Sequence, residues 1–532
     1  MMSLLDVMIP LEITAPKPEF RLLAPLILVL LGACLSILVE TTSKRGPRYG
    51  AQLIVSIVTL GAALALLVRN WIIGNAQIAM LGSIAVDGPT WFAWGALLVF
   101  GLMTALLFAE RRVSGGQSQF TAMGSSVPGS PLEREAIAAR AEHTEVFPLL
   151  LFSLFGMMLF ASANDLLVMF VALEIFSLPL YLLAGLARRR RMLSQEAALK
   201  YFLLGALSSA MFLYGTALLY GYAGSFQLRA IDQAISAGGQ GRGLLLAGMG
   251  LVAVGLLFKI GAVPFHSWTP DVYTGSPTPV TAFMAICTKF AAVVALMRVF
   301  YVGLGAARWD WQPLLAVIAV LTMCVGALIA LTQTDVKRML AYSSIAHAGF
   351  ILVAIVGANT AANGLLPGGI GSTSAVLVYL AAYGLATLGA FGLVTMVRKA
   401  GGEATSLAAW QGVGRKSPAL GALMALFLLS FAGVPPTAGF IGKLLAFTAA
   451  WKGGYPWLVG IAILMSLVAA FIYIRMIVVM FFRNPVDDEV EVVSPSWMTW
   501  LVVILGAVGT LVFGIYAQPL LDLAGQAGVF LR

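Results

Sequence analysis

Charged side chains are scarce in this sequence of 532 residues. Asp, Glu, Lys and Arg together make up 10% of it, while hydrophobic residues make up 60%. An average soluble domain has about 25% charged residues. This composition excludes a soluble protein and predicts an integral membrane protein surrounded by lipid.

Cysteines and cofactor-binding motifs are also lacking. The three cysteines, Cys34, Cys287 and Cys324, lie far apart in apolar segments, so no pair has the CxxC spacing used for iron–sulfur or zinc ligation. No glycine-rich nucleotide motif occurs between a strand and a helix. We therefore expect this chain to hold no metal, redox cofactor or nucleotide of its own. The net charge of +9 sits in short loops between apolar segments, where it sets membrane orientation rather than nucleic-acid binding.

Apolar runs of about 20 residues, the length that crosses a bilayer, recur along nearly the whole chain. They predict an all-α, polytopic membrane protein forming a single membrane domain over residues 1–532, with about 14 transmembrane helices. The expected spans are 22–42, 50–69, 89–109, 146–163, 165–187, 197–222, 243–263, 278–301, 313–332, 338–357, 374–397, 419–450, 456–482 and 498–518. A polar insertion at 113–142 is expected to form a loop with a short helix near 131–142.

Lys and Arg divide unequally between the two sets of loops that these spans define. One set holds 18 of them, including Arg188 to Arg191, and the other set holds 8. Because cytoplasmic loops carry the excess of positive charge, the 113–142 loop is expected in the cytoplasm. Both termini are then expected on the outer, periplasmic side of a bacterial plasma membrane.

Proline interrupts the seventh and twelfth predicted helices. Gly261-Ala-Val-Pro264 follows Lys259, and Gly433-Val-Pro-Pro436 precedes Lys443. Proline breaks the helical hydrogen-bond ladder, which lipid does not tolerate unless the freed groups find other partners. Two discontinuous helices five spans apart predict two inverted five-helix repeats. Helices 4–8 (146–301) would form one repeat and helices 9–13 (313–482) the other, with helices 1–3 (22–109) before them and helix 14 (498–518) after them. Ordinary proline kinks are the alternative.

Five ionisable residues lie within the apolar spans or at their edges: Glu174, Lys200, Lys259, Lys289 and Lys443. An ionisable group at membrane depth costs several kcal/mol unless it is paired or hydrated, so it marks a functional site. The use of lysine is informative because the chain has 22 Arg and only 10 Lys. A buried lysine can release its proton near neutral pH, whereas arginine stays protonated. The pattern predicts a proton relay.

Each of these residues also has a structural alternative. Glu174 and Lys259 could form a switchable ion pair that loads a proton, or a static pair that holds helices together. Lys289 has no acid near it in sequence, which favours a relay over packing. Lys200 could take part in transfer or extend its ammonium to the headgroups. His347 could relay protons or be a hydrogen-bonded packing residue.

Three segments resemble a known family. They are FKIGAVPFHSWTPDVYTGSPTPVTAF (258–283), YSSIAH (342–347) and LEIFSLPLY (173–181), and they closely resemble signature sequences of the antiporter-like membrane subunits of respiratory complex I. The resemblance covers residues 145–480. Within the family, the lysine at Lys443 argues against the M-type subunit, and the sequence ending soon after the last span argues against the L-type subunit.

The resemblance implies a proton-translocating subunit of a membrane-bound oxidoreductase that transfers electrons from NADH to quinone. It assigns Glu174 and Lys259 as a loading pair, Lys289 as the central relay and Lys443 as the terminal site, while Lys200 and His347 match family positions without a defined role. NADH, FMN, iron–sulfur clusters and quinone would bind in partner subunits. The expected partners are other membrane and peripheral subunits of complex I. An Mrp-type cation/proton antiporter subunit is the alternative function, and a scaffold that moves no ions is a third.

Overall fold

Helices dominate the computed structural model, which describes residues 19–531 apart from 75, 140, 240, 359–370, 400–401 and 486–489. Twelve helical spans are long and apolar enough to cross a membrane. The shorter α5 (Val146–Ser162) and the broken pair α17 (Pro418–Ala432) and α18 (Ala438–Lys452) bring the crossings in the described residues to 14. The prediction of an all-α polytopic protein with about 14 membrane helices is confirmed.

Each predicted span overlaps one of the observed crossings. The twelve long ones are α1 (Phe20–Thr42), α2 (Arg45–Ile73), α3 (Gly88–Phe108), α6 (Leu166–Ala184), α7 (Arg191–Ala223), α9 (Arg242–Ile260), the run from α11 (Thr278–Phe283) to α12 (Lys289–Arg298), α13 (Arg308–Thr332), α14 (Val336–Val356), α15 (Ser372–Val394), α19 (Pro456–Phe482) and α20 (Trp497–Ile515).

Short elements connect the crossings or follow the last one. The helices are α4 (Pro131–Ala138), α8 (Leu228–Ser236), α10 (Trp268–Gly275), α16 (Val413–Lys416) and α21 (Gln518–Gln526). The strands are β1 (Gln77–Ala79), β2 (Ile84–Val86), β3 (Val397–Lys399), β4 (Gly402–Glu403) and β5 (Glu491–Val492). β1 pairs antiparallel with β2, and β3 pairs antiparallel with both β4 and β5.

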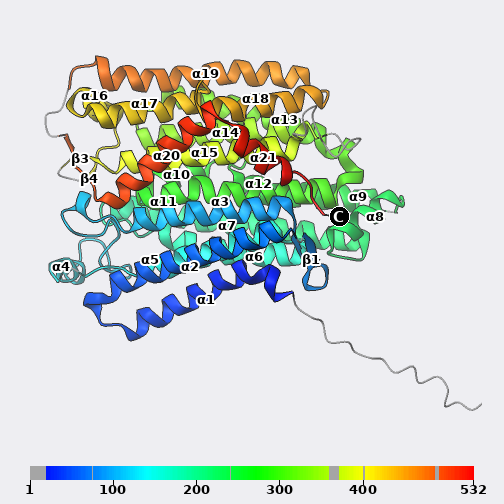
Figure 1. The fold of residues 1–532 in the computed structure, drawn as a ribbon, viewed down its shortest axis with the longest axis horizontal. Coiled ribbons are helices and arrows are strands. Elements are labelled where there is room, and N and C mark those ends of the chain that lie inside the picture. The colour runs from blue at the N-terminus through cyan, green and yellow to red at the C-terminus, as the bar shows by residue number, and fades with distance from the viewer. Residues whose placement is uncertain are drawn as a thin grey trace, which may run out of the picture.

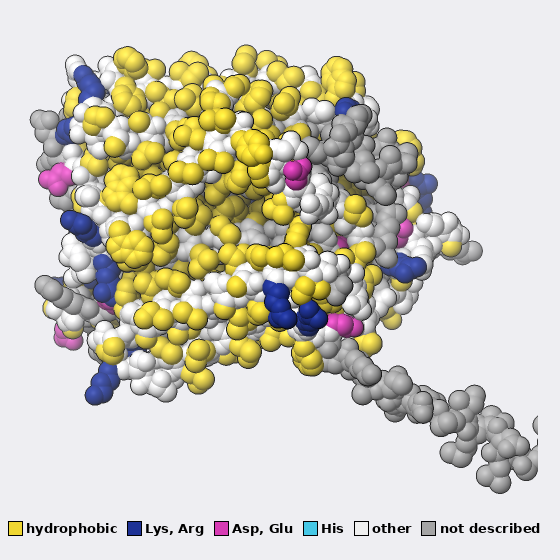
Figure 2. All heavy atoms as spheres, in the orientation of Figure 1, with side chains coloured by type: hydrophobic (Ala, Val, Ile, Leu, Met, Phe, Trp, Pro, Cys, Tyr) yellow, Lys and Arg dark blue, Asp and Glu magenta, His cyan; other side chains and the backbone are white. Residues whose placement is uncertain are grey.

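The long helices run side by side, and the connections gather at two opposite ends of the bundle (Figure 1). One end, which we call the C-terminal end, carries β1, α8 and the C-terminus. The other, the α4 end, carries α4, α16, β3 and β4. The start of α1 lies at the C-terminal end, because the backbone N–H of Met80 donates to the Glu19 carboxylate at 3.2 Å. Figure 2 shows hydrophobic side chains across the middle of this face, with Lys and Arg mostly toward the ends, as a bilayer requires.

The seventh and twelfth crossings are broken, as predicted. α9 and α17 both end at a glycine in the left-handed conformation, Gly261 with φ +78° and Gly433 with φ +81°. Glycine suits these positions because a Cβ is disfavoured there. After each break the backbone turns helical again, as α10 and α18.

Side chains donate to carbonyl groups at the ends of the two broken helices. The indole Nε1 of Trp268 donates to the Phe258 carbonyl at 2.9 Å, and Nζ of Lys443 donates to the Ala432 carbonyl at 2.9 Å. The backbone is thereby paired within the protein, which a membrane interior demands. At the second break the partner is one of the lysines that the sequence singled out.

The centre of the bundle is formed by the eighth, tenth and eleventh crossings. The most apolar window of Thr278–Gly303 is entirely buried, and α14 and α15 are nearly so. Two π-helical turns, Met284–Thr288 and Val299–Gly303, interrupt the eighth crossing, and Lys289 follows the first directly. Such turns are frequent at functional sites because they reorient the side chains that follow.

The polar insertion at 113–142 folds against the bundle at the α4 end. Its predicted short helix is present as α4. The N–H of Thr121 donates to the Leu186 carbonyl at 2.8 Å, and Arg191 forms an ion pair with Glu133 at 3.2 Å. These contacts attach the insertion to the turn between α6 and α7.

Candidate functional site

Lys259 lies in the last turn of α9 and is 2% exposed. Its Nζ donates to Ser177 Oγ on α6 at 2.8 Å and lies 3.4 Å from the Tyr181 hydroxyl. Four aromatic rings surround the ammonium with centroids 5.3 to 5.7 Å away, those of Phe176, Tyr181, Tyr201 and Phe258. The π faces stabilise the cation in a place from which water is largely excluded.

Glu174 lies on α6, one helical turn before Ser177, and is partly exposed. Its Oε1 is buried without a hydrogen-bond partner. Although both residues are described, Glu174 forms no ion pair with Lys259, whose ammonium lies against Ser177 instead. Glu174 and Ser177 are three residues apart and therefore share one face of α6.

Lys289 opens α12 and is 3% exposed. Its Nζ donates to both the carbonyl oxygen and Oγ of Ser344 on α14, each at 2.5 Å, and lies 5.3 Å from the centre of the Tyr383 ring. These partners are uncharged, and Lys289 takes part in no ion pair within the described residues. A lysine held only by neutral oxygens gains no compensation from a carboxylate for its burial.

His347 lies three residues after Ser344 on α14 and is 3% exposed. Its Nδ1 is 2.7 Å from the Tyr379 hydroxyl, and its Nε2 is 3.3 Å from the Tyr473 hydroxyl. The imidazole centroid lies 4.6 Å from that of Tyr383. Tyr383 therefore contacts both Lys289 and His347. Both ring nitrogens have hydroxyl partners, an arrangement that serves packing and proton transfer alike.

Lys443 lies on α18 and is 5% exposed. Besides the Ala432 carbonyl, its Nζ donates to Ser466 Oγ on α19 at 2.8 Å. A cavity of about 10 Å³, lined in part by His347, Ser430 and Gly442, lies beside it. That volume is close to the smallest that holds one water.

Lys200 does not join these buried groups. Its side chain is 43% exposed and forms ion pairs with Glu196 at 2.7 Å and Asp271 at 2.8 Å, and Asp271 also pairs with Arg338 at 2.9 Å. The network joins the second and third turns of α7, the first turn of α10 and the first turn of α14, toward the α4 end. This position agrees with the alternative in which the ammonium extends toward the headgroups.

The lysine partners Ser177, Ser344 and Ser466 were not identified from the sequence. Ser177 lies three residues after Glu174, and Ser344 lies three residues before His347. This helical spacing was a usable signal for two of the three. Ser466 carries no such signal, since only the packing of α19 against α18 brings it to Lys443.

Taken together, α9, α12, α14 and α18 place three lysines and a histidine in the interior, each bonded to hydroxyl groups. Hydroxyl, imidazole and amine groups can each accept one proton and donate another. Among the described residues, no group of three or more His, Cys, Asp or Glu side chains could hold a metal ion. The chemistry that this set of residues offers is proton transfer.

Comparison with known proteins agrees with this geometry. Residues 163–472 match a family model described as NADH:quinone oxidoreductase/Mrp antiporter, TM. The NADH-quinone oxidoreductase subunit N of Cutibacterium acnes is 58% identical over 525 residues, covering 98% of this chain and 97% of the relative. The subunit N of Rhodococcus opacus is 51% identical over 539 residues and covers 98% of each sequence.

Solved structures show the same fold. A chain of respiratory complex I from Thermus thermophilus is 35% identical, with a TM-score of 0.74 over 94% of this chain and 99% of that one. A chain of the Mrp complex from Dietzia is similar in fold alone, with 20% identity and a TM-score of 0.77 over 96% and 97%. On the identity and coverage of its relatives, the chain belongs to the NADH-quinone oxidoreductase subunit N family.

Proposed function

We propose that this chain translocates protons across the bacterial plasma membrane as a membrane subunit of an NADH-quinone oxidoreductase. One observation carries the proposal: Lys259, Lys289 and Lys443 are each at least 95% buried, and each Nζ is bound by a serine hydroxyl. Burying one ammonium at membrane depth costs several kcal/mol. Three such groups on helices with breaks or π-turns are best explained by transport.

Glu174 and Lys259 form the loading site of this proposal. Contact with the Glu174 carboxylate would favour the protonated lysine, whereas the neutral Ser177 hydroxyl compensates its charge less. Moving the ammonium between Ser177 and Glu174 would then load and expel one proton. The unpartnered Oε1 of Glu174 supports this, since the carboxylate is free to receive the lysine.

Lys289 is the central relay and Lys443 the terminal site. The Ser344–His347 face of α14 and the Tyr383 ring connect Lys289 to the cavity beside Lys443. We assign His347 to this connection. Lys200, with its two ion pairs, is assigned to the protein surface toward the α4 end rather than to the buried relay.

Electron transfer would take place in partner subunits, which we expect to be other membrane and peripheral subunits of complex I. NADH, FMN, iron–sulfur clusters and quinone would be bound there, and this chain would hold no redox cofactor. Coupling would reach Glu174 through neighbouring helices, because this residue is the one member of the relay that is partly exposed.

The architecture that suits this function is a pair of inverted repeats, 146–301 and 313–482, each with a helix that breaks at a left-handed glycine. We assign the C-terminal end to the periplasm, which places both termini outside. The α4 end, with the 113–142 insertion, then lies in the cytoplasm.

Cysteine labelling tests this orientation. A membrane-impermeant maleimide should label Gln526→Cys in right-side-out vesicles, because Gln526 ends α21 and the next residue, Ala527, lies against Gly88 at the start of α3, at the C-terminal end. It should label Glu135→Cys on α4 only after permeabilisation. Both residues are exposed. The reverse pattern would place the termini inside and contradict the assignment.

Copurification tests the function. Captured from mild-detergent extracts of its own membranes, the protein should elute in a large assembly that oxidises NADH with reduction of quinone. A mock capture from cells with the untagged protein serves as the control. A protein that elutes without NADH-oxidising partners, and that exchanges cations for protons in vesicles, would instead establish the antiporter.

A further inference from the structure

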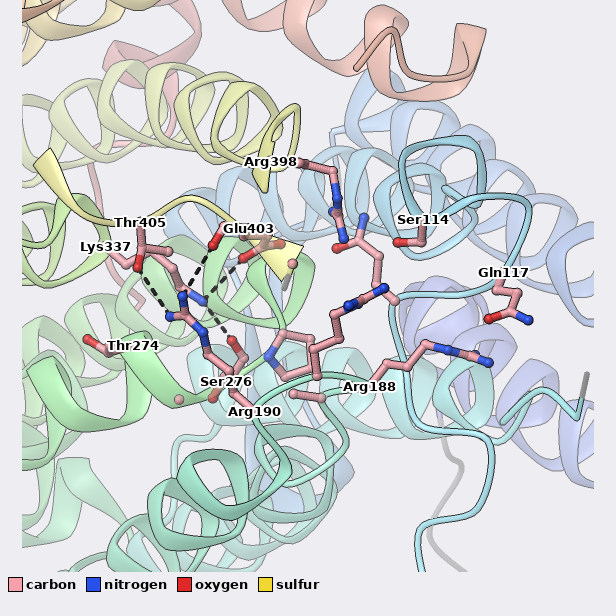
Figure 3. A pocket seen from close by; sticks show the side chains of 16 residues that line it. Ser114, Gln117, Arg188, Arg190, Thr274, Ser276, Lys337, Arg398, Glu403 and Thr405 are labelled. Carbon is pink, nitrogen blue, oxygen red and sulfur yellow. Dashed lines mark hydrogen bonds and ion pairs between the residues drawn. The ribbon is translucent and has the colours of Figure 1, made fainter. Parts of the chain in front are cut away.

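A polar cavity of about 80 Å³ lies at the α4 end (Figure 3), and its lining does not include Lys259, Lys289 or Lys443. Five segments contribute to its lining: the polar insertion, the turn between α6 and α7, the junction of α10 and α11, the first turn of α14, and β3 and β4 with Thr405. The proton relay proposed above uses none of these residues.

The lining is strongly cationic. Arg188, Arg189, Arg190, Lys337 and Arg398 line the cavity, against a single carboxylate, that of Glu403. Five positive groups at one small site repel one another, and a low-dielectric setting strengthens the repulsion. A bound anion would relieve it.

Part of this charge is already paired. Arg190 donates to the Thr405 hydroxyl at 3.2 Å and to the Glu403 carbonyl at 3.3 Å, while Nζ of Lys337 donates to the Ser276 carbonyl at 2.7 Å and lies 3.9 Å from the Glu403 carboxylate. Figure 3 shows this network on one side of the cavity and Arg188 and Arg398 on the other. Glu403 therefore interacts with Arg190 and Lys337, which lie on one side of the cavity.

Several buried polar atoms of the residues that line the cavity lack a partner. Gln119 is 9% exposed and Ser276 is 2% exposed, yet Nε2 and Oε1 of Gln119 and Oγ of Ser276 make no hydrogen bond. Nη2 of Arg188 is buried and unpaired as well. Buried polar groups are nearly always satisfied, so the three unpaired donors Gln119 Nε2, Ser276 Oγ and Arg188 Nη2 among the lining residues indicate a place for an acceptor.

We propose that this cavity binds the phosphate group of an anionic ligand, either inorganic phosphate or the headgroup of an acidic phospholipid. Guanidinium groups match the geometry of phosphate oxygens, and the Gln119 amide and Ser276 hydroxyl add donors from other directions. Drug-sized ligands occupy about 300 Å³ or more, so this cavity fits a headgroup phosphate but not a nucleotide. Basic pockets between membrane helices on the cytoplasmic side are suited to acidic lipid headgroups.

The site would join segments that are distant in sequence. A ligand there would contact the 113–142 insertion, the turn before α7 and the first turn of α14 through Lys337. We therefore expect its clearest effect to be protection of the insertion and of the β3–β4 segment against local opening.

Hydrogen exchange on the assembled complex tests the site. The complex is freed of phospholipid in detergent and phosphate-free buffer, and exchange is followed in peptides covering 113–125 and 395–399. We add inorganic phosphate, phosphatidylglycerol in mixed micelles, or phosphatidylcholine as a lipid without net charge. Saturating ligand should slow exchange in both peptides by about tenfold. Slower exchange with inorganic phosphate identifies a free-anion site. Slower exchange with phosphatidylglycerol but not with inorganic phosphate identifies a lipid headgroup site.

Two variants remove polar groups from the cavity lining and leave the residues of the proton relay unchanged. Arg398→Gln removes one charge, and Ser276→Ala removes only a hydroxyl, so it serves if the first variant fails to assemble. Both should weaken the protection at least about threefold. Arg415→Gln is the matched control, because Arg415 is exposed at the same end but binds the Arg483 carbonyl outside the cavity. The proposal is overturned if neither phosphate nor phosphatidylglycerol slows exchange, or if Ser276→Ala is protected as fully as Arg415→Gln.

Discussion

Substituting Lys289 with methionine should lower NADH-driven proton translocation by about tenfold or more while leaving stability unchanged or higher. Methionine removes the ammonium with little change in buried volume. Lys289 is 3% exposed and held only by the two Ser344 oxygens, so its charge is costly where it lies. A residue kept for packing would show the opposite pattern, with stability lost and transport retained.

Initial rates of acidification in proteoliposomes containing the purified complex, driven by NADH and a quinone, give the transport readout. Thermal unfolding of the same preparation gives the stability readout. Lys289→Arg is the diagnostic variant: arginine restores the charge but does not release its proton, so it should not restore transport. Lys452→Ala is the matched control, since Lys452 is an exposed lysine at the end of α18. Transport at the unaltered rate in Lys289→Met would remove Lys289 from the relay.

Asp87→Ala should cost about 3 to 5 kcal/mol of the free energy of unfolding, because it leaves a buried arginine without its counter-ion. Asp87 and Arg298 are 1% and 0% exposed and are joined twice, Nη1 to Oδ2 at 2.9 Å and Nη2 to Oδ1 at 2.8 Å. Asp87 also accepts from the N–H of Thr90, at the start of α3, and from that of Leu531 near the C-terminus. One carboxylate thus connects three distant segments.

Equilibrium unfolding of the full-length protein in mixed micelles provides the measurement. The double variant Asp87→Leu with Arg298→Met is the critical comparison, because replacing a whole buried ion pair with apolar side chains is often neutral or stabilising. It should recover most of the loss, less the contribution of the helix cap that Asp87 provides for α3. A double variant as unstable as Asp87→Ala would show that the loss does not come from the uncompensated arginine.

Much of the architecture follows from the sequence. Lipid offers no hydrogen bonds, so each crossing must be a continuous apolar helix or a break whose polar groups are paired within the protein. That constraint is local, and all 14 spans and both interruptions, after Lys259 and before Lys443, could therefore be located from hydropathy and proline alone. The cost of burying charge likewise marked Glu174, Lys259, Lys289 and Lys443 as exceptional before any packing was known.

Only the tertiary structure decided what those charges touch. Hydropathy indicates how deep a residue lies but not which helix lies beside it, because helix neighbours are set by side-chain packing between distant segments. For this reason Lys259 meets Ser177 rather than Glu174, Lys443 meets Ser466, and Lys200 lies among exposed carboxylates. The pairing of Asp87 with Arg298, 211 residues later, is beyond any local pattern. The sequence thus determined how deep each charged residue lies in the membrane, and the tertiary fold determined which residues it contacts.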